Sequence, residues 1–446
     1  MEEEKITTTE NSSESPRKRR ILLGLGVNIC RLVLAATLIF SGFVKAVDPV
    51  GTQYKIEDYL AAIGLQGLLT DWLSLIASVA LATLEFTLGI LILFAIQRRL
   101  ASRVALLLMA AMTVVSIWLV VANPISDCGC FGDALKLTNG QTLAKNLILL
   151  ACAAVTAKWA TVMPRIISES SQWIVENFTP LFIIAVSIYC IHYLPLIDFR
   201  PYHIDADIRK GMEIPEGAPE AVVEQTFVME KDGEQREFTI ENYPDSTWTF
   251  VERHDKVISP GYVPPIHDFS ITDDEGNDLT DQILDDEGFT FLLIAPQLEK
   301  ASESCFGDID HIYEYCLEHQ HGFICLTASG EKAREEWRDD TGAEYQIATT
   351  DETTLKTIIR SNPGLLLLKK GKILGKWSHN DMPKLDNGND KKIFSNAAPT
   401  EYKTQSAKTL VTLLMWFALS LIVLTITDRL WAWSKYIRKK KKEKTT

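Results

Sequence analysis

Six long apolar runs constrain this chain of 446 residues more than any other feature of its sequence. Each run is nearly free of charge and long enough to cross a hydrocarbon core of about 30 Å, which takes about 20 helical residues. The sequence therefore predicts a multi-span protein whose surroundings are a lipid bilayer. The predicted spans lie near residues 25–46, 73–96, 104–122, 143–163, 177–197 and 407–428.

Basic residues orient these spans, because the cytoplasmic ends of spans carry an excess of Lys and Arg. With six spans, four basic segments fall on one side, whereas the loops 47–72 and 123–142 hold only Lys55 and Lys136. We expect a bacterial inner-membrane protein with both termini in the cytoplasm and residues 198–406 in the periplasm. The basic segments are Arg17–Arg20, the group Arg98, Arg99 and Arg103, the pair Lys158 and Arg165, and Arg438–Lys442.

The acidic residues are concentrated between the fifth and sixth spans. Of the 58 Asp and Glu residues, 42 lie between Asp198 and Glu401, and the rest of the chain is net basic. Such a block is typical of a solvated domain surface. It disfavours nucleic acid as a partner, because phosphate binding needs a basic face. The expected partners are the lipid bilayer and a periplasmic protein client.

A Cys-Gly-Cys sequence follows the third predicted span, with Cys128 and Cys130 separated by Gly129. Two thiols one residue apart close only a small, strained ring, and a strained, exposed disulfide exchanges easily. This favours redox chemistry. Two structural thiols and half of a metal site are the competing interpretations, although a metal site normally takes about four ligands and no His lies nearby, so we assign no metal. Cys152 and Cys190, inside apolar runs, are expected to be packing residues.

Two ionisable residues fall within or beside the spans. Glu85 lies near the middle of the second span, where a carboxylate is costly unless it is paired or protonated, so it is a functional candidate. Lys45 lies near the outer end of the first span and is expected to reach the interface or to pair with Glu85. Arg31, near the inner end, is expected to anchor at the interface.

The first four spans resemble the DoxX-like membrane proteins and, within them, the MauE family named for methylamine utilisation. The resemblance covers about residues 28–163. It is carried by Ser41–Pro49 (SGFVKAVDP), Glu85, Cys128–Gly132 and Asn146. MauE-like proteins are associated with maturing a periplasmic, disulfide-rich enzyme subunit. The resemblance therefore implies thiol–disulfide or related redox work at the membrane.

A mechanism follows by analogy with DsbB and the vitamin K epoxide reductases. The four-span bundle would pass electrons from Cys128 and Cys130 to a lipid quinone, and Glu85 would handle a proton. The second cysteine pair that is usual in those proteins is not visible in the sequence of these spans. No nucleotide, flavin or haem motif stands out.

The block between the fifth and sixth spans divides into two parts. Residues 198–263 contain short alternating segments, Val222–Val228 and Arg236–Ile240, which predict a β-hairpin turning at Lys231–Gly233. Residues 264–395 alternate between strand and helix, which is an α/β order. The expected strands are 289–295, 323–327, 345–348, 364–368 and 372–377, and the expected helices are 304–319, 331–340 and 352–360.

This α/β part resembles the thioredoxin-like fold of the TlpA and peroxiredoxin type over about residues 264–380. Pro264–Ile271 matches the opening strand, and Pro363 falls where that fold places its cis-proline. The Cys-x-x-Cys of the family is absent. Cys305 alone lies near that place, at an expected helix N-terminus that would lower its pKa. Cys316 follows on the same helix, and Cys325 is expected in the core.

The predicted fold is a membrane helical bundle with an α/β thioredoxin-like domain outside the cytoplasm. The predicted function is thiol–disulfide exchange or protein maturation through Cys128 and Cys130, with Glu85 and Cys305 as further catalytic candidates and Lys45, Asn146 and Pro363 as motif residues. The alternative is a non-enzymatic anchored binding factor. The expected parts are a basic tail (1–24), the four-span domain (25–163), a fifth span (164–197), a β-rich extension (198–263), the thioredoxin-like domain (264–395), a sixth span (407–428) and a second basic tail (429–446).

Overall fold

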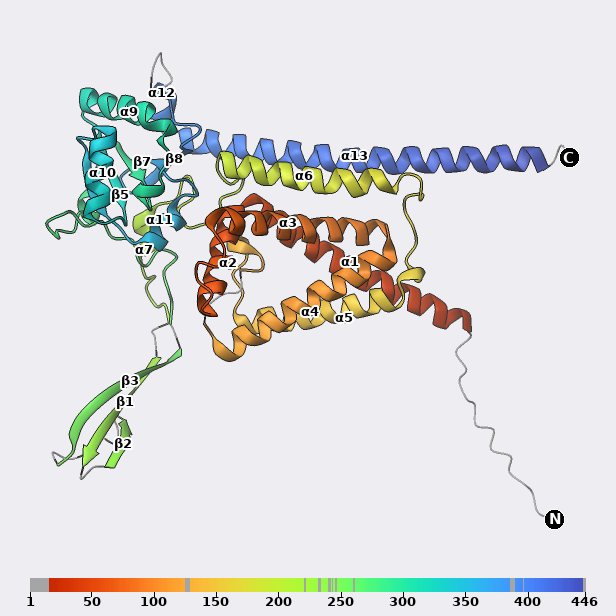
Figure 1. The fold of residues 1–446 in the computed structure, drawn as a ribbon, viewed down its shortest axis with the longest axis horizontal. Coiled ribbons are helices and arrows are strands. Elements are labelled where there is room, and N and C mark those ends of the chain that lie inside the picture. The colour runs from red at the N-terminus through yellow and green to blue at the C-terminus, as the bar shows by residue number, and fades with distance from the viewer. Residues whose placement is uncertain are drawn as a thin grey trace. The chain divides into compact units, whose positions relative to one another are not determined.

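The computed structural model describes residues 16–124, 129–219, 222–231, 234–239, 242, 244, 247–259, 261–385, 390–395 and 397–443. The chain forms two compact units (Figure 1). The membrane unit consists of residues up to Phe199 together with residues from Lys403 onward, and the second unit consists of Arg200–Tyr402.

Six helices of the described chain are long and apolar enough to cross a membrane, as the sequence predicts. A seventh helix, α2 (Pro49–Ala62), lies between the first two of them in the sequence. The six are α1 (Pro16–Val47), α3 (Asp71–Phe94), α4 (Arg98–Ala122), α5 (Asn139–Lys158), α6 (Gln172–His192) and α13 (Ala398–Glu443). Two single 3-10 turns, η1 (Gly132–Ala134) and η2 (Ala160–Val162), precede and follow α5.

Helix α2 begins where α1 ends because Asp48 and Pro49 form a helix start. The Asp48 carboxylate accepts a hydrogen bond from Gly51 N at 2.9 Å, and Pro49 occupies a first-turn position that needs no N–H donor. This turn fixes the end of α1, where Lys45 lies.

Helices α1 and α3 pack closely at two glycines. A Cβ atom on Gly42 would lie 2.4 Å from Phe86 N, and one on Gly89 would lie 2.8 Å from Ile39 N, so neither position accepts a side chain. Small residues of this kind let the backbones of membrane helices approach each other. The close approach brings Lys45 opposite Glu85.

The remaining spans join this pair through apolar contacts. Leu34, Leu38 and Ile92 pack with Ala105 and Leu149 in one cluster, which joins α1 and α3 to α4 and α5. A second cluster contains an aromatic stack in which Phe182 of α6 and Phe417 of α13 lie 4.2 Å apart by ring centroids. Helix α13 therefore packs along α6 (Figure 1).

The second unit contains a five-stranded sheet in the order β6-β5-β4-β7-β8. Strands β4, β5 and β6 are parallel, and β7 and β8 are antiparallel to their neighbours. The strands are β4 (Thr290–Ile294), β5 (Gly322–Thr327), β6 (Gln346–Thr349), β7 (Gly364–Lys369) and β8 (Lys372–Ser378). The main connecting helices are α9 (Phe306–His319), α10 (Glu331–Thr341) and α11 (Glu352–Ile358).

This strand order, with a cis peptide bond between Asn362 and Pro363 at the start of β7, is that of a thioredoxin-like domain. The predicted fold class and the predicted cis-proline are confirmed. Every residue of β4 is buried, as expected for a central strand covered on both faces. The shorter elements of this unit are α7 (Ile208–Met212), α8 (Thr280–Leu284), η4 (Leu298–Lys300), η5 (Glu303–Cys305) and α12 (Asp390–Ile393).

A separate three-stranded antiparallel sheet has the order β2-β1-β3. Strands β1 (Val222–Lys231) and β2 (Glu234–Thr239) form the predicted hairpin, whose turn residues Asp232 and Gly233 lie outside the described residues. Strand β3 (Thr249–Ser259) was not expected. Its central residues 252–256 are all charged or His, which conceals the alternation of a strand.

Candidate functional site

Lys45 and Glu85 form an ion pair between α1 and α3. Lys45 Nζ lies 2.8 Å from Glu85 Oε2, and both side chains are about 95% buried. The predicted ion pair is confirmed, and the prediction that the Lys45 side chain extends to the membrane interface is wrong. The prediction that Arg31 anchors at the interface is also wrong. Arg31 is buried and donates to Asn28 Oδ1 at 3.0 Å and to the carbonyl of Leu93.

The ion pair also holds the loop that contains Cys130. Lys45 Nζ donates to the carbonyl oxygen of Cys130 at 2.8 Å and to Ser41 Oγ at 2.7 Å. Ser41 Oγ donates to the same carbonyl at 2.8 Å. An ammonium group has three N–H donors, and all three are used here. We call this arrangement of Ser41, Lys45 and Glu85 the carbonyl clamp.

The loop from Gly129 to Leu137, called the Cys130 loop, folds back on α1. Gly129 and Gly132 adopt φ values of +60° and +52°, which few residues other than glycine adopt readily. Phe131 is buried against Phe40 of α1, with ring centroids 5.3 Å apart. These contacts fix the backbone on both sides of Cys130, whose side chain stays half-buried.

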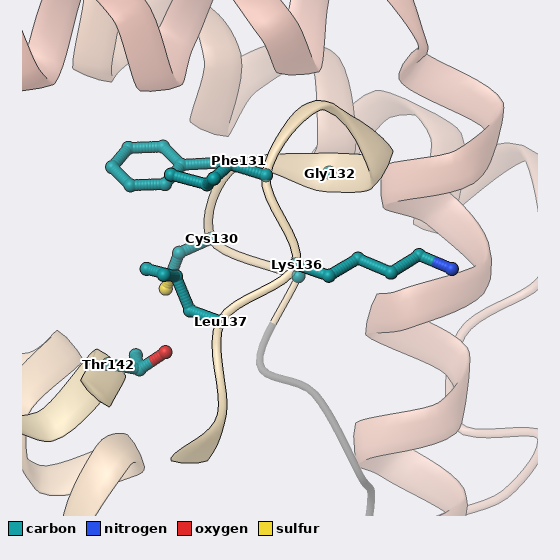
Figure 2. Close-up of a pocket in the computed structure, with 8 residues that line it drawn as sticks. Cys130, Phe131, Gly132, Lys136, Leu137 and Thr142 are labelled. Atoms are coloured by element: carbon teal, nitrogen blue, oxygen red, sulfur yellow. The ribbon is translucent and has the colours of Figure 1, made fainter. Parts of the chain in front are cut away.

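A cavity of about 10 Å³ lies beside the loop, and its lining includes Cys130, Lys136, Leu137 and Thr142 (Figure 2). A space of this size holds one water molecule. It is too small for a quinone ring.

Cys128, the partner of Cys130 in the predicted redox pair, lies outside the described residues. The structure brings together Lys45, Glu85 and Cys130 of the predicted site residues. Asn146 serves a different contact: its Nδ2 donates to Ser116 Oγ of α4 at 2.6 Å and to the carbonyl of Met112 at 3.3 Å. Asn146 therefore joins α5 to α4.

The cysteines of the thioredoxin-like domain lie in a different environment. Cys305 caps the N-terminus of α9, as the sequence predicts, but its side chain is fully buried. Burial raises the pKa of the Cys305 thiol to about 11, so the predicted lowering of this pKa is wrong. Burial also raises the pKa of Cys316 and of Cys325 to about 12. Cys325 lies in the core, as expected.

Sequence reasoning missed two residues of the membrane unit. Ser41 stands out in the sequence only as part of a motif, although its spacing of four residues from Lys45 places both on one helix face. Thr142, which lines the cavity beside Cys130, carries no signal in the sequence.

Comparisons with known proteins match two segments of this chain to family models. Residues 23–158 match the family model described as Methylamine utilisation protein MauE, and residues 223–260 match a domain of unknown function (DUF8463). No curated protein matched the chain. A similar solved structure is the "solution structure of a putative protein disulfide isomerase from Bacteroides thetaiotaomicron", with 17% identity and a TM-score of 0.22. The match covers 26% of this chain and 76% of that one.

The spans and the α/β sheet define the class: a multi-span membrane protein that carries a thioredoxin-like domain. Within this class, residues 23–158 are similar to the MauE family, and the match covers less than a third of the chain. The matched region contains the carbonyl clamp and the Cys130 loop.

Proposed function

We propose that the Cys130 loop carries out thiol–disulfide exchange with extracytoplasmic protein clients, using Cys128 and Cys130. The observation that carries the proposal is the carbonyl clamp. A buried ion pair within a membrane is costly and is retained where it has a task. Here Lys45 of the pair and the neighbouring Ser41 each donate a hydrogen bond to the backbone carbonyl of Cys130, which they hold in place while leaving the sulfur half-buried.

The exchange needs no further reactant. In the oxidising direction, a client thiolate attacks the Cys128–Cys130 disulfide and forms a mixed disulfide with one of the two sulfurs. A second client thiolate then attacks that mixed disulfide. The client leaves with one disulfide and has lost two electrons and two protons, and the loop has gained them as two thiols. The reverse sequence reduces a client disulfide.

The orientation in this proposal is that of an inner-membrane protein with both termini in the cytoplasm. The four basic segments named above support it, because they fall on one side of the six spans. The Cys130 loop and the thioredoxin-like domain then face the periplasm, where disulfides form and persist.

The thioredoxin-like domain has a binding role in this proposal. Its three thiols are buried and have pKa values of about 11 to 12, so at neutral pH they are protonated and shielded from a client. The same observation favours the second candidate function, in which the whole chain is a non-enzymatic binding factor anchored in the membrane.

A disulfide exchange assay separates the two functions. The purified full chain in lipid nanodiscs is mixed with a fluorogenic peptide disulfide and a dithiol reductant. Under the proposal, Cys130→Ser abolishes turnover. Reduced Cys128→Ser, mixed with the peptide after the dithiol has been removed, accumulates a mixed disulfide between Cys130 and the peptide. Cys30→Ser, a thiol of the same bundle outside the loop, serves as the control and keeps the wild-type rate. Full turnover by Cys130→Ser would leave the binding factor as the better account.

A further inference from the structure

Thr142 has a buried hydroxyl group that the contacts above do not use. Its side chain is 1% exposed, and its Oγ1 has no hydrogen-bond partner in the described structure. Burying a hydroxyl in this way costs free energy, so each such group calls for an explanation. Thr142 lines the cavity that Cys130 also lines, and Figure 2 shows its hydroxyl directed toward the side where the Cys130 sulfur lies.

Threonines of the bundle differ in how they use the hydroxyl group. The hydroxyl groups of Thr87, Thr142 and Thr179 have no hydrogen-bond partner in the described structure, and of these three residues Thr142 lines the cavity beside Cys130. Thr83 and Thr113 each satisfy their hydroxyl group on the carbonyl four residues earlier in their helix, at 2.7 Å. In Thr142 the equivalent carbonyl, that of Thr138, accepts the backbone N–H of Thr142 at 2.9 Å, and the hydroxyl is not bonded to it. The hydroxyl therefore remains available to the cavity.

The surroundings of the cavity favour a negative charge. Thr142 lies in the first turns of α5, whose N-terminus carries a capping box formed by Thr138 and Gln141, and the N-terminal end of a helix is the positive end of its dipole. Charged groups approach the Cys130 loop from every element packed against it, and cations outnumber anions. They are Lys45 of α1, Lys55 of α2, Glu85 of α3, Asp133 of η1, Lys136 of the loop and Lys145 of α5.

We propose that the Thr142 hydroxyl donates a hydrogen bond across this cavity to the thiolate of Cys130, with room for one bridging water molecule. Thr142 is then a positioning residue for the sulfur that reacts. This inference rests on the proposed exchange at Cys130, because the thiolate and not the thiol is the attacking species.

The test is the pH dependence of Cys130 alkylation. Reduced full-length protein carrying Cys128→Ser is treated with iodoacetamide between pH 5 and 10, and the Cys130 peptide is quantified by mass spectrometry. Thr142→Val, which keeps the shape and removes the hydroxyl, raises the apparent pKa of Cys130 by about one unit and slows alkylation at pH 7 about tenfold. Thr142→Ser restores the profile. Thr156→Val is the matched control, because Thr156 is buried on the same helix and bonds the carbonyl of Ala153.

Equal profiles for Thr142→Val and the parent protein would overturn the inference. Should Thr142→Val not fold, Thr142→Ala carries the same expectation and the same refutation. The disulfide exchange assay remains a separate readout. A shifted alkylation profile in a protein that lacks exchange activity would refute the proposed function alone, whereas exchange activity with an unshifted profile would refute the role of Thr142 alone.

Discussion

Cys130 of the membrane unit and Cys305 of the thioredoxin-like domain differ in how far their surroundings bury the thiol. Cys130 lies half-buried in a loop whose backbone is held by a lysine, a serine and two glycines. Cys305 lies at the N-terminus of a helix within a fold known for redox chemistry, yet it is fully buried and its pKa is raised to about 11. The difference teaches that a position at a helix N-terminus does not by itself expose a thiol or lower its pKa.

The largest expected effect is a difference in labelling rate between the two regions. At pH 8, a thiol with a pKa of about 11 or 12 is ionised to roughly one part in 10³ or 10⁴, whereas a thiol with the ordinary pKa of 9.0 is ionised to roughly one part in ten. We expect maleimide to label Cys130 at least about a hundred times faster than Cys305, Cys316 or Cys325 in reduced, folded protein. Peptide mass spectrometry over a time course measures the rates. Similar labelling rates for Cys130 and Cys305 would contradict the expected difference between the two regions.

The next effect comes from breaking the carbonyl clamp. Lys45→Met leaves Glu85 buried without a cation and removes the hydrogen bond from Lys45 to the Cys130 carbonyl, one of the two that the clamp makes to this loop. Loss of one partner of a buried ion pair costs about 3–5 kcal/mol, so the thermal unfolding temperature of the membrane unit falls and exchange at Cys130 falls with it.

The double variant Lys45→Met with Glu85→Met separates these two effects. It removes both charges, so most of the lost stability returns, whereas the hydrogen bond from Lys45 to the Cys130 carbonyl does not. We expect near-normal unfolding together with low exchange activity. Normal exchange in this variant would show that the clamp does not position the thiol.

High pH should destabilise the thioredoxin-like domain. The thiols of Cys305, Cys316 and Cys325 have folded pKa values of about 11 to 12, above the ordinary value of 9.0, so above about pH 9 the unfolded chain releases protons that the folded domain retains. The stability then falls as pH rises, by about 2 kcal/mol for each thiol at pH 10.5. The urea concentration at which Cys325 becomes labelled measures this stability.

The matched control for high pH is a variant with one titrating thiol fewer. Cys316→Ala should show a smaller decrease in the urea midpoint between pH 8 and pH 10.5 than the parent protein. An unchanged midpoint in the parent protein across this range would contradict the assigned pKa values.

The smallest effect is expected at two further thiols of the bundle. Cys30 of α1 and Cys152 of α5 are both partly buried, and a thiol in an apolar environment behaves as a small hydrophobic side chain. Cys30→Ala should change the unfolding free energy by about 1 kcal/mol or less and leave exchange unchanged. A loss of exchange would instead show that Cys30 takes part in the chemistry.

Much of the fold could be predicted because its signals are local. Hydropathy gave the six spans, and the strand and helix pattern gave all five strands of the thioredoxin-like sheet. Strand β3 and helix α2 were missed for local reasons as well. Charged residues interrupt the apolar alternation of β3, and α2 has few buried residues, so neither shows a clear pattern.

The candidate site was only partly predictable because it depends on burial and on distant contacts. Lys45, Glu85 and Cys130 could be named because charges in spans and paired cysteines are rare. Ser41 contacts a carbonyl 89 residues away, and no sequence signal reports that contact. The helix N-terminus at Cys305 was visible in the sequence, but the burial that raises its pKa was not.

The hydrogen bonds of the carbonyl clamp go to the main chain of residue 130 and not to its side chain. Every amino acid has the same carbonyl oxygen. The hydrogen bonds from Ser41 and Lys45 are therefore retained in any replacement of the cysteine that the glycine-flanked backbone tolerates. Anchoring and reactivity are thus separable traits that mutation can alter one at a time. A selenocysteine, a serine or an unnatural crosslinking residue at this position would keep the same backbone hydrogen bonds. The loop is therefore a convenient place to introduce a new reactive side chain at a membrane surface.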